Sequence, residues 1–313
     1  MNEKAPYSAA MTSFASPAER AHPPALGYVY ATLVVAIWTG FILVSRAGGV
    51  SMLTPWDVIA IRYATAAALL LPFWWFHRRI VLFNRRGVSL AMLGGLGYAV
   101  LAYASFKLAP AAHAAVLLPG LQPFAAALAA WFLLGETPGA TRRAGLALIA
   151  GGIVCLGADV LRGESAVLRG DLLMVGASLC WACYSVLLRR WALSPWDATL
   201  AVTLLTALVY LPVYLVALPK QLHQAPWPDI AVQAVYQGVV ATIVQMVLYV
   251  RTIALIGPTR LGMWMALVPG LAGVTAVPLL GETLSGWTAL GLGLVGLGAW
   301  LGNRRLFFNP RSA

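Results

Sequence analysis

Polar and aromatic side chains recur inside long apolar stretches of this sequence, where hydrocarbon would leave them without hydrogen-bond partners. Glutamine amides can bind amino, carboxylate or amide groups, and aromatic rings can stack on planar molecules or attract cations. The alternative role is hydrogen bonding between helices, together with aromatic belts at the membrane surface. We predict that ten of these side chains bind a small molecule: Trp38, Tyr98, Tyr103, His113, Gln122, Trp181, Tyr184, Gln237, Gln245 and Trp264. On one stretch, Thr242, Gln245 and Tyr249 have the spacing of a single α-helical face.

Two prolines are expected deep inside helices. Pro110 and Pro258 are expected to begin two helices, so Pro119 would lie about 13 Å further along and Pro269 similarly deep. A proline inside a helix removes one backbone hydrogen bond and frees a carbonyl. We therefore predict hinges at Pro119 and Pro269, with a purely structural bend as the alternative.

Charged side chains are scarce inside the apolar stretches. Every Asp and Glu lies in a tail or near an expected helix end, which leaves His113 as the candidate for a proton relay. We therefore favour a facilitator, with proton exchange through His113 as second choice. Arg62 is the exception, inside a helix, where it could snorkel outward, pair internally or bind a substrate carboxylate. Internal pairing is the favoured interpretation.

Motifs for metal, nucleotide or catalytic chemistry are weak. The Cys180-x-x-Cys183 spacing has no further ligands and is expected to serve packing. Gly291-x-Gly293-x-x-Gly296 follows no strand, so close helix packing, with Gly151 and Gly152 in the first half, is favoured over dinucleotide binding. We expect no metal, no cofactor and no enzymatic activity.

The composition is that of a membrane protein. Hydrophobic residues make up 61% of the 313 residues, charged residues make up 10%, and the mean hydropathy is +0.81. Soluble domains carry roughly 25% charged residues. Ten stretches approach the length of about 20 residues that spans a bilayer. We predict spans at 25–46, 55–76, 88–106, 111–134, 141–158, 170–190, 196–217, 229–255, 258–280 and 285–302.

The net charge of +11 has a topological explanation rather than a role in nucleic-acid binding. With the N-terminus in the cytoplasm, fifteen Lys and Arg residues fall on the cytoplasmic side and five on the other side. The positive-inside rule therefore predicts that both termini are cytoplasmic.

Four motifs occur twice, in the same order and 140 to 150 residues apart. Two homologous halves are the simplest explanation, and internal repeats in a membrane protein are typical of transporters. The pairs are Trp38 to Arg46 with Trp181 to Arg189, Thr54-Pro55-Trp56-Asp57 with Ser194-Pro195-Trp196-Asp197, Leu118-Pro119-Gly120-Leu121 with Val268-Pro269-Gly270-Leu271, and Gly135-Glu136-Thr137 with Gly281-Glu282-Thr283.

An odd number of helices per half requires the second half to be inverted. Arg142 and Arg143 follow the first Gly-Glu-Thr, whereas no basic residue follows the second one closely. Glu136 and Glu282, at helix ends, are expected to satisfy free backbone donors, with a gate as the alternative. Thr54 to Asp57 and Ser194 to Asp197 predict N-terminal capping boxes.

Over residues 28–302 the chain resembles the EamA-type branch of the drug/metabolite transporter superfamily. The resemblance rests on Trp38, Arg62-Tyr63, Pro119 and Gly135-Glu136, with Trp181, Pro269 and Gly281-Glu282 in the second half. Val202 stands where the second half would repeat Arg62. The resemblance implies export or exchange of small polar or aromatic metabolites, and a cavity lined by helices 1, 3, 4, 6, 8 and 9.

These observations predict an all-α membrane protein with ten transmembrane helices in two inverted five-helix repeats. The repeats are expected at 25–159 and 170–302, between a disordered tail at 1–24 and a second tail at 303–313. The predicted function is alternating-access export or exchange of metabolites across the bacterial inner membrane, with aromatic amino acids as the first guess. A homodimer is compatible with the sequence. The alternatives are a flippase for lipid-linked head groups and a membrane-embedded transferase.

Overall fold

The computed structural model describes residues 24–77, 81–160 and 165–304, and these residues form helices and their connections, without a strand. Nine helical stretches among them are long and apolar enough to cross a membrane, and Gly286–Gly302 is a shorter apolar helix. The ten-helix architecture predicted from the sequence is thus confirmed. The predicted tails lie almost wholly outside the described residues.

Six of the ten spans are single helices: α2 (Pro24–Val50), α3 (Pro55–His77), α8 (Ala140–Val160), α9 (Ser165–Arg190), α10 (Pro195–Ala217) and α15 (Gly286–Arg304). The other four are composite. Elements labelled η are π-helical. Span 3 consists of α4 (Arg85–Leu90), η2 (Ala91–Gly97) and α5 (Tyr98–Leu108), and span 4 consists of α6 (Ala111–Ala115), η3 (Val116–Gly120) and α7 (Gln122–Leu134). Span 8 consists of α11 (Trp227–Gln233), η4 (Ala234–Val244) and α12 (Gln245–Ile256), and span 9 consists of α13 (Pro258–Met265) and α14 (Val268–Leu280).

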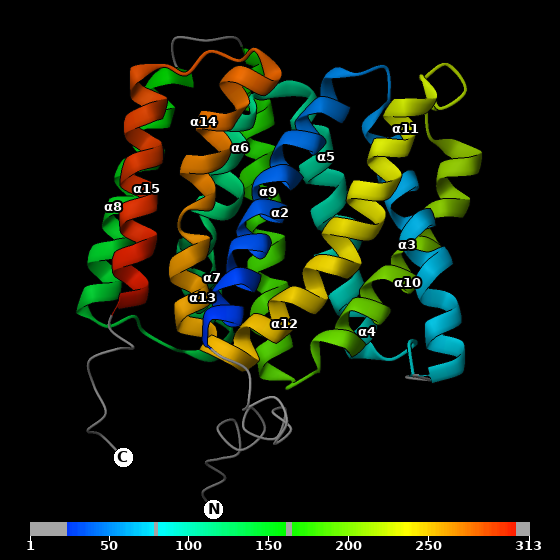
Figure 1. Ribbon diagram of the computed structural model, residues 1–313, viewed down its shortest axis with the longest axis horizontal. Coiled ribbons are helices and arrows are strands. Elements are labelled where there is room, and N and C mark those ends of the chain that lie inside the picture. The colour runs from blue at the N-terminus through cyan, green and yellow to red at the C-terminus, as the bar shows by residue number, and fades with distance from the viewer. Residues whose placement is uncertain (1–23, 78–80, 161–164, 305–313) are drawn as a thin grey trace, which may run out of the picture.

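The helices pack as a bundle in which the halves alternate (Figure 1). α8 and α15 lie together at one edge, and α3 and α10 lie together at the other. Between these pairs, α2 contacts α12 and α14 of the second half, while its sequence counterpart α9 contacts α5 and α7 of the first half. This exchange of partners is the arrangement that two inverted repeats require. We call the end where α2 begins and α15 ends the terminal end, and the other the far end.

Glycines bring α8 and α15 into close contact. A Cβ added to Gly152 would lie 2.7 Å from the Gly291 carbonyl oxygen, and one added to Gly145 would lie 2.5 Å from that of Gly298. Gly145 and Gly291 each lie nine residues after the glutamate of their Gly-Glu-Thr motif, so the two contacts are symmetry equivalents. Gly packing is thus confirmed for Gly152 and Gly291, whereas a Cβ on Gly293 would meet nothing within 4 Å.

The predicted capping box at the start of α3 is present. The Asp57 backbone N–H donates to Thr54 Oγ1 at 3.1 Å, and the Thr54 N–H donates to Asp57 Oδ2 at 2.8 Å. Asp57 also accepts hydrogen bonds from the Tyr214 hydroxyl at 2.6 Å and from the Gln221 N–H at 3.1 Å. The carboxylate therefore joins the start of span 2 to the end of span 7.

Spans 4 and 9 are interrupted close to their prolines. Pro119 lies in the π-helical segment η3, and span 9 breaks at a turn just before Pro269, which is near the start of α14. A Cβ on Gly120 would lie 3.7 Å from Pro269 Cγ, so the two interruptions meet. The Ser178 hydroxyl of α9 donates to the Leu117 carbonyl, which satisfies a backbone acceptor at the break.

The uniform α-helical spacing assumed for span 8 is wrong. Ala234–Val244 is π-helical, and Thr242 donates to the carbonyl of Gln237, five residues earlier. The α-helical spacing expected between Thr242 and the two later residues therefore does not hold across the end of this segment. Gln245 and Tyr249 follow it in α12, one helical turn apart; Gln245 faces the bundle interior, and Tyr249 is 36% exposed.

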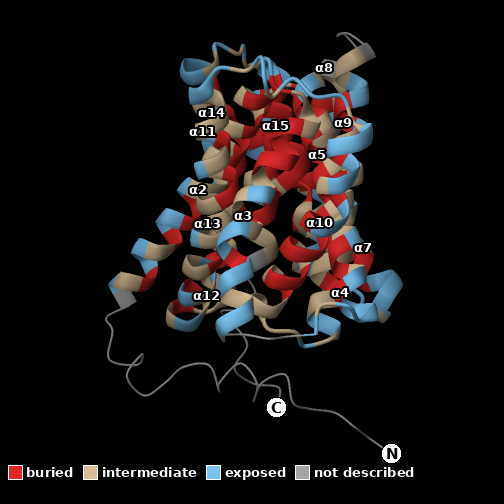
Figure 2. Cartoon of the chain, turned by 90° about the vertical axis from the view of Figure 1, so that its right-hand side faces the viewer, coloured by how far each residue is buried: buried red, intermediate tan, exposed pale blue. Residues whose placement is uncertain are grey.

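Buried residues gather in the interior and exposed ones on the outside (Figure 2). Much of that outside is apolar, including Phe76, Phe132 and Val216. Soluble monomers rarely expose contiguous apolar surface of this kind, whereas lipid tails accept it. The exposed surface therefore fits a bilayer.

Candidate functional site

A small pocket lies between the halves, near the middle of the spans that line it. The cavity volume, counted as the space that the centres of water molecules can occupy, is about 40 Å³. That is enough for a few water molecules but too small for a metabolite. A bound metabolite therefore requires the site to widen. The lining residues come from α2, α3, α5, α9, η4 and α12: Ile37, Trp38, Phe41, Arg62, Tyr98, Trp181, Ala241 and Gln245.

The pocket walls are mainly aromatic. Trp38 and its counterpart Trp181 meet edge to face, with ring centroids 6.1 Å apart and planes at 79°. Tyr98 packs on Trp181 at 5.0 Å, and Phe41 packs on Trp38 at 5.9 Å. Equivalent tryptophans from the two halves thus meet at one point, and they offer flat apolar surfaces to a planar ligand.

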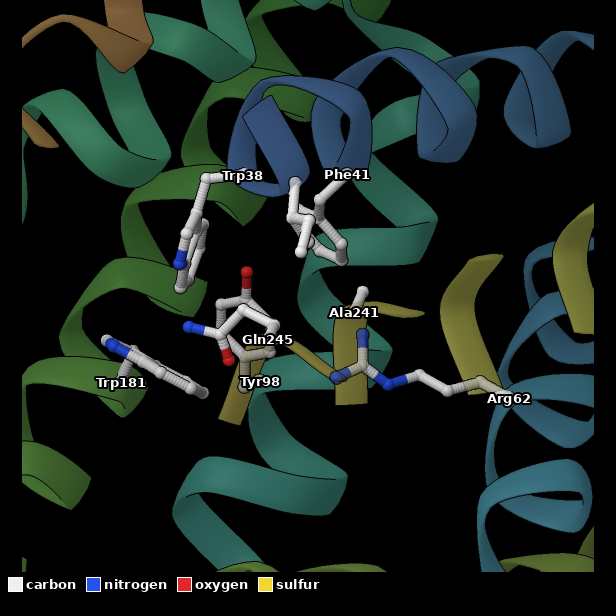
Figure 3. Close-up of a pocket in the computed structure, with 8 residues that line it drawn as sticks. Trp38, Phe41, Arg62, Tyr98, Trp181, Ala241 and Gln245 are labelled. Carbon is white, nitrogen blue, oxygen red and sulfur yellow. The ribbon is translucent and has the colours of Figure 1, made fainter. Parts of the chain in front are cut away.

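Arg62 brings a positive charge into this aromatic site. Figure 3 shows its side chain reaching from α3 toward Ala241 and Gln245, with Trp38 and Trp181 on the opposite side. The guanidinium carbon lies 5.7 Å from the Phe41 ring centroid and 5.8 Å from that of Tyr63. The ring faces therefore supply part of the stabilisation of this cation.

Several donors in the pocket have no partner. The Nε of Arg62 and the Nε1 of Trp38 are buried without a hydrogen bond. The Gln245 side-chain amide makes no hydrogen bond to the residues that the structure describes. Buried polar groups are normally satisfied, so these groups are available to a ligand or to water.

A chain of hydrogen bonds holds Arg62 from behind. Arg62 Nη1 donates to the Tyr103 hydroxyl at 2.8 Å, and Tyr103 donates to Gln237 Oε1 at 2.9 Å. Gln237 Nε2 in turn donates to Ser45 Oγ at 2.9 Å. The network links spans 1, 2, 3 and 8. Arg62 thus has the internal partner that the sequence analysis favoured, and this partner is a phenol hydroxyl.

The structure brings four of the ten predicted binding residues into the pocket: Trp38, Tyr98, Trp181 and Gln245. Tyr103 and Gln237 stand behind Arg62 in the network just described. Tyr184 packs on Trp181 with ring centroids 5.0 Å apart, and Gln122 begins α7; neither lines the pocket. Trp264 packs against Tyr28 at 6.2 Å, also away from the pocket.

His113 lies outside the pocket, in the far half of the bundle. Its Nδ1 is 3.1 Å from both carboxylate oxygens of Asp171, and both residues are buried. His113, the candidate for a proton relay, therefore has an acidic partner near the start of α9.

Three lining residues were not predicted from the sequence, Ile37, Phe41 and Ala241, and substrate binding by Arg62 was only an alternative to internal pairing. Ile37, Phe41 and Ala241 are of types that fill any apolar helix, so nothing in the sequence distinguishes them. Arg62 had a signal, because it is a charge inside a span whose own sequence offers no acid nearby except Asp57 at the helix start.

Two symmetry-equivalent ion pairs join the halves at opposite ends. At the far end, Arg46 Nε lies 2.7 Å from Glu282 Oε1, and at the terminal end Arg189 Nη2 lies 2.7 Å from Glu136 Oε2. Each arginine follows its pocket tryptophan by eight residues. The far pair is the more enclosed, with side chains 16% and 14% exposed against 41% and 50% for the terminal pair.

The far pair also holds two helix ends. Arg46 Nη1 donates to the Phe106 carbonyl at 2.7 Å, and Glu282 Oε2 accepts from the Ala111 N–H at 2.8 Å. The expectation that Glu282 satisfies a free backbone donor is confirmed. Glu136 instead accepts a hydrogen bond from Arg189, and the neighbouring Arg190 donates to the Leu133 carbonyl at 3.3 Å.

The described residues contain no group of three His, Cys, Asp or Glu side chains placed to hold a metal ion. Cys155, Cys180 and Cys183 are free thiols, all partly buried. The side chains that line the pocket are rings, aliphatic groups, one amide and one guanidinium.

These features define a multi-pass membrane protein with a small aromatic pocket between inverted halves. The model of the EamA-like transporter family matches residues 25–158 and 168–304. The chain belongs to the EamA-like transporter family, whose members are membrane transporters of small substrates. One solved protein crystal structure is similar in fold, with a TM-score of 0.61 and 21% identity over 90% of this chain and 98% of that one. No curated protein matches the sequence.

Proposed function

We propose that this protein is a secondary carrier that exports or exchanges small metabolites across the bacterial inner membrane by alternating access. Aromatic amino acids are the first candidates, because the pocket is walled by Trp38, Trp181, Tyr98 and Phe41. Assembly of the protein as a homodimer remains a prediction from the sequence.

The observation that carries the proposal is the position of the pocket between two equivalent ion pairs. The pocket lies at the meeting point of Trp38 and Trp181, and eight residues beyond each tryptophan an arginine binds the glutamate of the other half. Breaking the far pair would open the pocket to one side, and breaking the terminal pair would open it to the other. Inverted repeats make the two opened states alike in structure, which is the requirement for alternating access.

The orientation is supported by charge. Arg142, Arg143, Arg189 and Arg190 lie at the ends of helices that reach the terminal end, whereas the far end carries fewer basic residues. Basic loops stay in the cytoplasm. We therefore assign the terminal end to the cytoplasm and the far end to the periplasm.

The charges near the pocket favour transport down the substrate gradient. The charged group that lines the pocket is Arg62, which stays protonated at any physiological pH. Proton exchange through His113 is the second candidate, and the buried contact between His113 and Asp171 is the observation that favours it.

The test is counterflow of radiolabelled amino acids in proteoliposomes that contain the purified protein. Vesicles loaded with an unlabelled amino acid should accumulate the labelled one transiently and saturably. Trp181→Ala and Gln245→Ala should weaken exchange by about tenfold or more, because each removes pocket surface or a free amide. Trp131→Ala, on the exposed face of α7, is the matched control and should leave exchange near the wild-type rate.

Saturable exchange that depends on Trp181 and Gln245 would support the proposal. Exchange of other metabolites, but of no amino acid, would support the carrier function and contradict the assignment of amino acids as substrates. Absence of exchange for every soluble metabolite, with scrambling of lipid-linked head groups instead, would replace the carrier with the flippase alternative.

A further inference from the structure

The charge balance of the pocket points to the chemical class of its ligand. Arg62 is the cation among the lining residues, and the other seven are apolar, aromatic or amide side chains. Arg62 forms no ion pair with the residues that the structure describes. An arginine in the membrane interior normally has an anionic or carbonyl partner. This site therefore has an excess positive charge that a ligand can neutralise.

The geometry of the guanidinium indicates which anion fits. Nη1 is occupied by the Tyr103 hydroxyl, whereas Nε is buried without a partner and Nη2 makes no hydrogen bond to the described residues. The N–H groups of Nε and Nη2 point in parallel along one edge of the guanidinium plane. Two parallel donors match the two oxygens of a carboxylate, which is the bidentate pairing that arginine makes and lysine does not.

We propose that the substrate carries a carboxylate that binds the Nε–Nη2 edge of Arg62, while an apolar, planar part of the same molecule packs among Trp38, Trp181 and Tyr98. This inference rests on the proposed carrier function and specifies its substrate as a ring-bearing monoanion or zwitterion. Trp38 Nε1 and the Gln245 amide supply further hydrogen bonds for polar groups next to the carboxylate.

A carboxylate fits the site better than a phosphate does. A phosphate dianion needs several cations or a cluster of backbone N–H groups, and this lining offers one arginine among helical segments. The network from Tyr103 through Gln237 to Ser45 fixes Arg62 in place before the ligand arrives, which reduces the entropic cost of binding.

The experiment measures binding to the purified full-length protein by isothermal titration. The probes are L-phenylalanine and 3-phenylpropanoate, each compared with its primary amide, together with phenyl phosphate. The wild type should bind both acids about tenfold or more tightly than the amides, because the charge-assisted pairing with Arg62 is lost in the amide. Phenyl phosphate should bind more weakly than 3-phenylpropanoate.

Arg62→Gln should reduce the preference for acid over amide to less than about threefold, and Arg62→Lys should keep part of it because the charge remains without the bidentate geometry. Arg142→Gln, an equal loss of charge at an exposed position on α8, is the matched control and should keep the full preference. If Arg62→Gln fails to fold, the preference for acid over amide is compared between the wild type and Arg62→Lys.

Equal binding of acids and amides to the wild type, no binding of either acid, or an acid preference that survives in Arg62→Gln would each overturn the inference. Tighter binding of phenyl phosphate would also overturn it, in favour of a phosphorylated ligand. Failure of the carrier function is distinguishable, because counterflow would then be absent for every solute. If only the carboxylate assignment is wrong, neutral or cationic solutes would exchange and the acids would not compete.

Discussion

Arg46 and Glu282 come from different halves of the chain and form an ion pair of 2.7 Å at the far end of the bundle, between the ends of spans 3 and 4. Arg189 and Glu136 repeat this contact at the terminal end. In the proposed carrier, each of these two contacts acts as the latch on one side of the central pocket.

Glu282→Gln should open the far end. The substitution removes the charge that holds Arg46 and leaves one amide oxygen in place of the two oxygens that accept from Arg46 Nε and the Ala111 N–H. Hydrogen bonds to charged groups contribute about 1.5–3 kcal/mol each. In a cysteine-free background, a cysteine at the fully buried Ser45 should then react about tenfold or more faster with a membrane-impermeant thiol reagent. Glu136→Gln is the matched control at the other end and should not raise this rate. Equal thiol-labelling rates in the unsubstituted cysteine protein and in its Glu282→Gln and Glu136→Gln variants would contradict the role of the far ion pair as a latch.

The two pairs should differ in their contribution to stability. Arg189→Gln should change the free energy of unfolding by about 1 kcal/mol or less, because exposed ion pairs contribute little. Arg46→Gln should cost about 2–3 kcal/mol, because its partner is enclosed and its bond to the Phe106 carbonyl is lost. Denaturant unfolding of the purified variants in detergent measures both, and equal costs would be inconsistent with the difference in enclosure.

Tyr103→Phe should weaken substrate binding without touching the ligand. Loss of the hydroxyl frees Arg62 Nη1 and leaves Gln237 Oε1 unpaired, so the guanidinium loses its fixed position. We expect KM for counterflow to rise about three- to tenfold, with a smaller change in maximal rate. A variant with unchanged KM would show that the network does not position Arg62.

Packing of α8 on α15 should depend on glycine at the contact points. Gly152→Val places side-chain atoms against the Gly291 carbonyl and should cost about 1–3 kcal/mol through overpacking. Gly293→Ala, where an added Cβ meets nothing within 4 Å, is the control on the same interface helix. Thermal unfolding should separate the two variants, and equal midpoints would contradict the close contact.

His113 should not couple transport to protons. The imidazole is held by Asp171 away from the pocket, so an imposed pH gradient should change counterflow less than about twofold in both the wild type and His113→Gln. Uphill accumulation driven by the gradient in the wild type, and its loss in His113→Gln, would establish proton exchange instead. Unfolding experiments on Asp171→Asn separately measure what the pair contributes to stability.

The sequence was sufficient to predict the architecture. Apolar stretches define the spans, and motifs such as Gly135-Glu136-Thr137 and Gly281-Glu282-Thr283 define the repeat. Each of these signals is local, so each can be read without knowing which helices touch. The glycine contact between Gly152 and Gly291 was predictable for the same reason, because glycine clusters in apolar helices favour close packing.

The site was only partly predictable, because a pocket depends on helix rotation. Tyr98 and Tyr103 lie on one helix, yet Tyr98 lines the pocket and Tyr103 stands behind Arg62. The π-helical segment Ala234–Val244 changes the rotation of span 8 and has no clear sequence signature. For Arg62 the sequence favoured internal pairing over substrate binding. α3 lies at an edge of the bundle, but the long arginine side chain reaches from it into the centre.

The most direct test of the account is reversible crosslinking of each latch. With Cys155, Cys180 and Cys183 replaced by serine or alanine, the double variants Arg46→Cys/Glu282→Cys and Arg189→Cys/Glu136→Cys place one cysteine pair at each end. Alternating access predicts that bridging either pair with a short, reducible bifunctional thiol reagent stops counterflow in proteoliposomes, and that a reductant restores it. Counterflow that continues with one end verifiably crosslinked would contradict the account.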